Sequence, residues 1–161
     1  MSRLQKIIFI SLLVAQGVVI GLIENMIPYP FAFAPGAKLG LANIIGLVTL
    51  VIYGFKYALT VNLLRCFIAG IASGAITSMM YSMAGAFTST ILMWIAYKKL
   101  NKYFSLVGVS VLGALGHNIA QLTVAAILIT NIRIFTYLPI MMLASIVTGI
   151  FIGLTVNFTV S

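Results

Sequence analysis

Long apolar runs separated by short polar stretches follow one another along this chain. Most of the runs reach the roughly 17 to 25 residues with which a helix crosses a hydrocarbon core about 30 Å thick. The pattern therefore predicts an all-α polytopic membrane protein with about six transmembrane helices in a single domain, residues 1–161. The second and third spans are short, and we expect their ends to be buried against protein. The predicted spans are roughly 7–27, 39–54, 57–74, 78–97, 105–130 and 135–157.

The composition excludes a water-soluble globular protein. Apolar residues make up 63% of the chain, charged residues make up 6%, and the mean hydropathy is +1.23. Such a chain has too little polar surface to cover a soluble domain, so the membrane is the solvent that the sequence predicts.

The distribution of basic residues predicts the orientation. If the N-terminus is cytoplasmic, six cations fall on the inner side and two on the outer side. Because Lys and Arg are enriched in cytoplasmic segments, we expect both termini to be cytoplasmic. The net charge of +8 then reflects topology and attraction to anionic membrane lipid, and it predicts no nucleic-acid partner. The inner set is Arg3, Lys6, Lys56, Lys98, Lys99 and Lys102, and the outer set is Lys38 and Arg133.

Polar residues within the spans gather at one level, the outer half of the bundle. An arginine near the middle of a membrane helix is costly, so Arg65 should face the interior and find a partner or a ligand. His117, Asn118 and Gln121 lie within about 100° of one another around their helix, so they share one face. We therefore predict an outward-opening pocket for a small anionic or amphipathic solute. The candidate binding residues are Glu24, Asn25, Lys38, Asn43, Arg65, Tyr81, Ser82, His117, Asn118 and Gln121.

A structural interpretation of the same residues stays open. Glu24 is the only acidic residue, and either Arg65 or Lys38 would serve as its ion-pair partner. His117 and the amides would then hold the helices together through hydrogen bonds. Under the pocket hypothesis, Glu24 instead orients one of these cations at the outer rim or contacts the ligand.

The segment PYPFAFAPGAK follows the first span and contains three prolines. Pro28, Pro30 and Pro35 are spaced so that the segment cannot be helical. We predict a semi-rigid flap over the pocket, since ring-restricted residues lose little entropy on closing.

Pairs of small residues four apart describe a second kind of surface. This spacing lets two helix backbones approach closely, either within the bundle or against a partner. The pairs are Ser11 with Ala15, Gly17 with Gly21, Gly70 with Gly74, and Gly149 with Gly153. We expect internal packing for most of them, and we expect Ser11 and Ala15 to be the pair that docks a partner helix.

The residues required for several reactions are absent from the sequence. The chain has no aspartate and one glutamate, whereas a prenyl diphosphate synthase needs aspartate-rich clusters to hold magnesium. Its single histidine and single cysteine do not make a metal site. No nucleotide-binding fingerprint is present, so any use of ATP would fall to partner subunits. We predict no enzymatic activity, no metal and no intrinsic cofactor.

Four blocks of sequence resemble a known family: PGAKLGLANIIGLVTL, NLLRCFIAG, YSMAGAFTS and GVSVLGALGHNIAQLTVA. They are similar to small bacterial membrane proteins called the Gx transporter family, also known as heptaprenyl diphosphate synthase component I. That family in turn resembles the substrate-binding S components of energy-coupling factor (ECF) transporters. The resemblance implies a bacterial cytoplasmic-membrane protein with six helices, an outward pocket under the first loop, and a first helix that meets a transmembrane coupling subunit. It also implies two cytoplasmic ATPases as partners.

Together with the pocket hypothesis, the resemblance implies the substrate-binding component of an ECF-type uptake transporter. Its solute would resemble a vitamin, a quinone precursor or an isoprenoid precursor. Two alternatives remain: a noncatalytic membrane subunit in prenyl diphosphate or menaquinone synthesis, and a structural subunit of a membrane redox complex. Ser11 stands where alanine is usual in the S-component motif, and the missing aspartates conflict with the synthase name.

Overall fold

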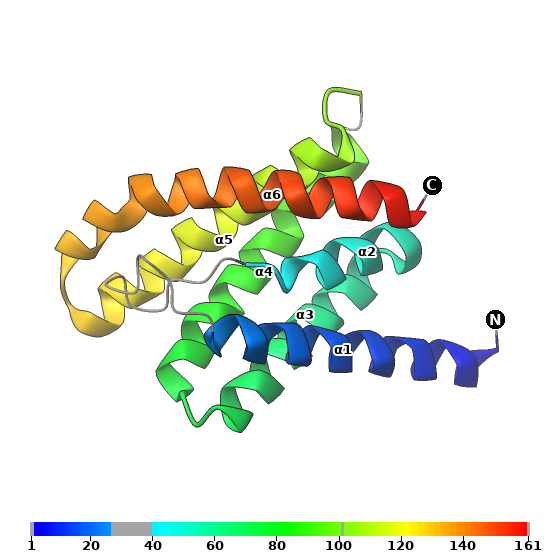
Figure 1. Ribbon diagram of the computed structural model, residues 1–161, viewed down its shortest axis with the longest axis horizontal. Helices are drawn as coiled ribbons and strands as arrows, with labels where there is room; N and C mark the ends of the chain where they lie inside the picture. Colours follow the sequence, from blue (N-terminus) through cyan, green and yellow to red (C-terminus); the bar gives the residue numbers. More distant parts are fainter. Residues whose placement is uncertain (1, 27–39, 101, 161) are drawn as a thin grey trace.

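The structure of the protein, a computed structural model, describes residues 2–26, 40–100 and 102–160, without the side chain of Asn25. Within these residues the fold is all-α, with six α-helices and one 3-10 helix, η1 (Figure 1). The predicted flap and Lys38 lie outside the described residues. The elements are α1 (Arg3–Met26), α2 (Asn43–Tyr53), α3 (Phe55–Ala72), α4 (Ile76–Lys99), α5 (Leu106–Ile129), η1 (Ile132–Tyr137) and α6 (Leu138–Val160).

The predicted spans coincide with these helices, and the prediction of an all-α membrane bundle is confirmed. Five of the described helices are long and apolar enough to cross a membrane, counting η1 with α6. The exception is α2, whose 11 residues extend only about 16 Å and fall short of a hydrocarbon core. Its start differs from the prediction because Gly40 adopts a φ of 76° and opens a turn that ends at Asn43.

Helices α3, α4, α5 and α6 pack in sequence order, and α2 fills the space against α3 and α6. A hydrophobic core lies among them, with Leu47, Met93 and Ile152 almost completely buried. Gly149 and Gly153 let α6 touch α5, since a Cβ at Gly153 would lie 2.4 Å from the Cα of Val107. This glycine pair therefore serves internal packing, as expected.

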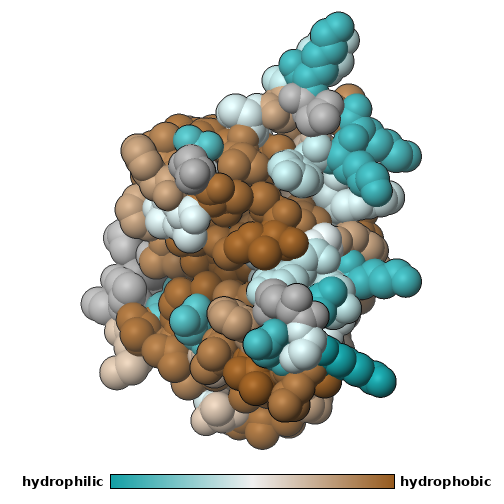
Figure 2. Space-filling view, turned by 90° about the vertical axis from the view of Figure 1, so that its right-hand side faces the viewer, coloured by the Kyte–Doolittle hydropathy of each residue, from teal (hydrophilic) through white to brown (hydrophobic). Residues whose placement is uncertain are grey.

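Helix α1 lies at the edge of the bundle. It packs mainly on α3, and 17% of an apolar 18-residue stretch of α1 is buried, compared with 33% to 44% for such stretches of the other long helices. The start of α1, the end of α6 and the α2–α3 turn lie at the same end of the molecule (Figure 1). Lys6, Lys56 and Lys98 gather there, and we call it the basic end. Figure 2 shows this end, with hydrophilic side chains along one side and hydrophobic surface beside them.

Candidate functional site

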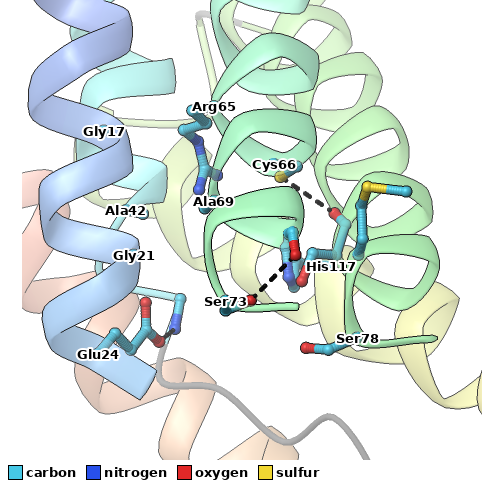
Figure 3. A pocket seen from close by; sticks show the side chains of 14 residues that line it. Gly17, Gly21, Glu24, Ala42, Arg65, Cys66, Ala69, Ser73, Ser78 and His117 are labelled. Carbon is cyan, nitrogen blue, oxygen red and sulfur yellow. Dashed lines mark hydrogen bonds between the residues drawn. The ribbon is translucent and has the colours of Figure 1, made fainter. Parts of the chain in front are cut away.

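A recess lies between α1, α3 and α4 on the side of Glu24, away from the basic end (Figure 3). Glu24, Arg65 and His117 supply its ionisable side chains, and most of the remaining lining residues are small, including three serines. The cavity volume is about 30 Å³, which is room for a water molecule. The other lining residues are Gly17, Gly21, Gly40, Ala42, Cys66, Ala69, Gly70, Ser73, Ser78, Met79 and Ser82.

Arg65 enters the recess from the middle of α3 and is 6% exposed. Its Nε donates to Oδ1 of Asn62 at 2.9 Å, and its Nη2 donates to Oδ1 of Asn43 at 2.9 Å. Asn62 in turn donates to Oγ1 of Thr90 at 2.8 Å. This chain of hydrogen bonds joins α2, α3 and α4 and fixes the position of the guanidinium.

Two glycines make room for this network. A Cβ at Gly17 would lie 2.8 Å from Cδ of Arg65, and a Cβ at Gly46 would lie 2.2 Å from Nδ2 of Asn62. Helices α1 and α2 can therefore close on the polar side chains of α3 only because these positions have no side chain. The expectation that Gly17 packs internally agrees with this contact.

The two charges of the recess lie at different depths. Glu24 accepts a hydrogen bond from the backbone N–H of Gly40, near the mouth. Arg65 packs against Gly17, which is seven residues earlier on α1 and about 10 Å away along the helix axis. Within the described part of the chain, Arg65 donates to two neutral amide oxygens and not to the carboxylate. Pairing of Glu24 with Lys38 involves a residue outside that part.

His117 faces the recess from α5, and Ser82 lines it from α4. Gly85 allows this approach, since a Cβ there would lie 2.7 Å from Nε2 of His117. Cys66 is buried beside them, with its Sγ 3.5 Å from the backbone oxygen of Ser82.

Tyr81 is also buried, but it packs in a separate hydrophobic cluster with residues such as Leu122 and does not line the recess.

The predicted cluster on α5 is divided by the structure. Asn118 faces α6, where its Nδ2 donates to Oγ of Ser145 at 2.6 Å and to the backbone oxygen of Met141 at 3.0 Å. Gln121 is completely buried and does not line the recess either. One step of about 100° along a helix is enough to turn adjacent residues toward different neighbours. Of this cluster, only His117 lies at the recess.

Several residues of the site carry no specific signal in the sequence. Thr90 completes the Arg65 network, yet threonines in membrane helices commonly bond to their own backbone, as Thr90 also does with Ala86. For Cys66, the sequence predicts only a small buried residue. The proximity of Asn62 to Arg65, one turn away, is predicted from spacing and agrees with the structure.

Ser11 and Ala15 lie on the exposed side of α1. Ala15 belongs to a shallow groove of about 360 Å³ that is lined by Leu12, Gln16, Val19 and Ile20 as well. Gly21, in contrast, faces the recess, and a methyl group added there would meet no atom of the described residues within 4 Å. The small residues of α1 therefore mark two sides of the helix, one toward the bundle and one away from it.

Among the described residues, no group of three or more His, Cys, Asp or Glu side chains is placed to hold a metal ion. The recess offers a fixed guanidinium, an imidazole and a carboxylate around a small space. Such an arrangement can bind the charged or polar head of a solute through hydrogen bonds.

Comparison with protein families identifies the family of the chain. The family described as heptaprenyl diphosphate synthase component I matches residues 13–159, which is nearly the whole chain. No curated protein and no solved structure matched.

Proposed function

The chain belongs to the heptaprenyl diphosphate synthase component I family, and from this premise we propose that it is the substrate-binding membrane component of an ECF-type uptake transporter. It captures a small anionic or amphipathic solute at the end of the bundle that holds Glu24. The solute class is that of vitamins, quinone precursors and isoprenoid precursors, which carry a polar or anionic head on a ring or chain.

The main support for the proposal is the burial of Arg65 and the neutral partners of its guanidinium. Its guanidinium is buried among membrane helices, and both hydrogen bonds it makes within the described residues go to neutral amides. A guanidinium has five N–H donors, so donors remain for a ligand. A carboxylate or phosphate would accept from them and compensate the charge that amides leave uncompensated.

The size of the recess requires a movement. A cavity of about 30 Å³ is far below the roughly 300 to 1,000 Å³ of sites that hold organic ligands. The recess is bounded by α1, the long helix with the smallest buried share. We infer that solute enters when α1 moves away from α3 and α4, and that the described arrangement is the closed one.

The orientation and partners follow from the same proposal. Both termini are cytoplasmic, the basic end faces the inner leaflet of a bacterial cytoplasmic membrane, and the recess opens outward. Ser11 and Ala15, with the groove beside them, offer α1 to a transmembrane coupling subunit. ATP is hydrolysed by two cytoplasmic partner subunits, and this chain contributes no catalytic residue or cofactor.

Native mass spectrometry of the protein purified gently from its own host tests this function. The wild-type protein should carry a stoichiometric metabolite, and Arg65→Gln should lose it. Arg133→Gln is the matched control, because Arg133 lies exposed in η1 and loses the same charge. Wild-type protein without any bound metabolite, or equal loss in both variants, would contradict the proposal.

The family description favours a second candidate, a noncatalytic membrane subunit of prenyl diphosphate or menaquinone synthesis. With one carboxylate side chain in the protein, the magnesium-dependent chemistry would have to come from an aspartate-rich partner. Copurification with a soluble prenyl diphosphate synthase, and with no coupling subunit or ATPase, would favour this candidate over transport.

A further inference from the structure

A second concavity lies at the basic end of the molecule, where α2 ends, α3 begins and α4 ends. Gly54, with a φ of 86°, turns the chain sharply between α2 and α3 and exposes the first turn of α3 to this space. The cavity volume is about 740 Å³, within the range of sites that bind organic ligands. We call it the basic-end recess; its lining residues are Leu50, Val51, Tyr53, Gly54, Phe55, Lys56, Tyr57, Trp94, Tyr97 and Lys98.

Aromatic rings form the walls of the basic-end recess. Phe55 and Trp94 pack with their ring centroids 5.1 Å apart, and Tyr53 meets Tyr57 edge to face at 6.3 Å. Leu50, which is 2% exposed, contributes apolar surface from the core. Rigid rings of this kind offer a large apolar area to a hydrocarbon chain at a small cost in side-chain entropy.

Cations stand at the rim of these walls. Lys56 and Lys98 are exposed residues of the lining, and Nζ of Lys6 lies 4.2 Å from the ring centroid of Tyr57. The only carboxylate side chain of the protein, Glu24, lies at the far end of α1. No acidic side chain therefore competes for these lysines, and an anion from outside the protein is their complement.

We infer that the basic-end recess is a second binding site, for an amphipathic phosphate: a phosphate or diphosphate head on an apolar tail. Lys56 and Lys98 hold the head, and the rings of Tyr53, Phe55 and Trp94 hold the first part of the tail. Lysines and aromatic rings also act as simple anchors at a membrane surface. The hollow of about 740 Å³ between the helices is what distinguishes a site from such anchors.

The chain contains one tryptophan, Trp94, which makes the site observable. The full-length protein in nanodiscs of phosphatidylcholine is supplied with brominated phosphatidylglycerol or brominated phosphatidylcholine, whose bromines quench nearby indole fluorescence. The anionic lipid should quench Trp94 saturably and at lower mole fraction than the zwitterionic one. This comparison uses the wild-type protein and needs no variant.

A charge-matched pair of variants tests the role of the two lysines. Lys56→Gln with Lys98→Gln should weaken the apparent affinity for phosphatidylglycerol by about tenfold or more. Lys99→Gln with Lys102→Gln removes the same charge from exposed positions outside the recess and should change it by less than about twofold. All four lysines are exposed, so neither change should prevent folding.

Two further additions identify the source of the phosphate. Displacement of the brominated lipid by farnesyl diphosphate, but not by inorganic diphosphate, supports the site and assigns it to a prenyl phosphate. Saturable quenching that farnesyl diphosphate does not reverse supports the site and assigns it to a membrane lipid. Equal quenching by the two brominated lipids, or equal loss in the two double variants, would overturn the inference.

Discussion

The carboxamide oxygen of Asn43 accepts a hydrogen bond from Nη2 of Arg65 at 2.9 Å and so ties the first turn of α2 to the middle of α3. Both side chains are buried, and α2 is too short to span the membrane by itself. A polar contact at the recess therefore holds the first turn of α2 against α3.

Asn43→Ala should destabilise the protein. The change removes an acceptor from a buried guanidinium, which costs about 1 to 3 kcal/mol in the free energy of unfolding. Reversible unfolding with sodium dodecyl sulfate in mixed micelles measures the difference. Thr60→Ala is the control, because its exposed hydroxyl bonds only to its own helix. Equal stabilities of the two variants would contradict a structural role for the Asn43 contact.

Asn43→Asp separates stability from ligand capture. A carboxylate in place of the amide would accept from Arg65 at the same position and neutralise its charge. We expect the folded protein to be at least as stable as the Asn43→Ala variant and to lose the metabolite that the wild-type protein retains. The measurement is native mass spectrometry beside the unfolding titration. Full retention of a bound anion by this variant would mean that the charge of Arg65 does not hold the ligand.

Gly17 and Gly21 lie one turn apart on α1 and should respond differently to the same change. Gly17→Ala forces a methyl group against Cδ of Arg65, whereas in the part of the chain that the structure describes Gly21→Ala meets no atom within 4 Å. Both gain the same helix propensity, so the difference between them reports the packing. We expect Gly17→Ala to be less stable than Gly21→Ala by about 1 to 3 kcal/mol. The reverse order of stability would show that α1 does not pack on Arg65.

His117 and Asn118 are adjacent in the sequence but should affect different properties. His117 lines the recess, so His117→Ala should lower metabolite occupancy. Asn118 joins α5 to α6, so Asn118→Ala should lower stability by about 1 kcal/mol and leave occupancy unchanged. Occupancy by mass spectrometry and stability by unfolding are measured on the same preparations. A loss of ligand with Asn118→Ala alone would place the site on the α6 side.

Much of the fold was predictable because hydropathy and helix length are properties of sequence segments. The start of α2 at Asn43, later than the predicted residue 39, could not be predicted, since it depends on the left-handed conformation of Gly40. The site was predicted less completely. The contact between Arg65 and Asn62 could be predicted, because a charge within a membrane helix needs nearby partners and helical spacing supplies them.

The remaining differences arise from packing between helices. The sequence places His117 and Asn118 on one broad face, but only the neighbours α4 and α6 decide which side chain lines the recess. In the same way, the sequence gives the spacing of the small residues of α1 but does not show which of them face the bundle. The structure turns Gly17 inward and leaves Ala15 exposed.

A crystal structure of the protein isolated from its own host, at a resolution that reveals ordered ligands, would show whether Arg65 holds a solute. We predict that α1 stands further from α3 and α4, and that a carboxylate or phosphate of a bound solute accepts hydrogen bonds from Arg65 at about 2.7 to 2.9 Å. A recess that stays closed at water size, with Arg65 bonded only to Asn43 and Asn62, would contradict this prediction.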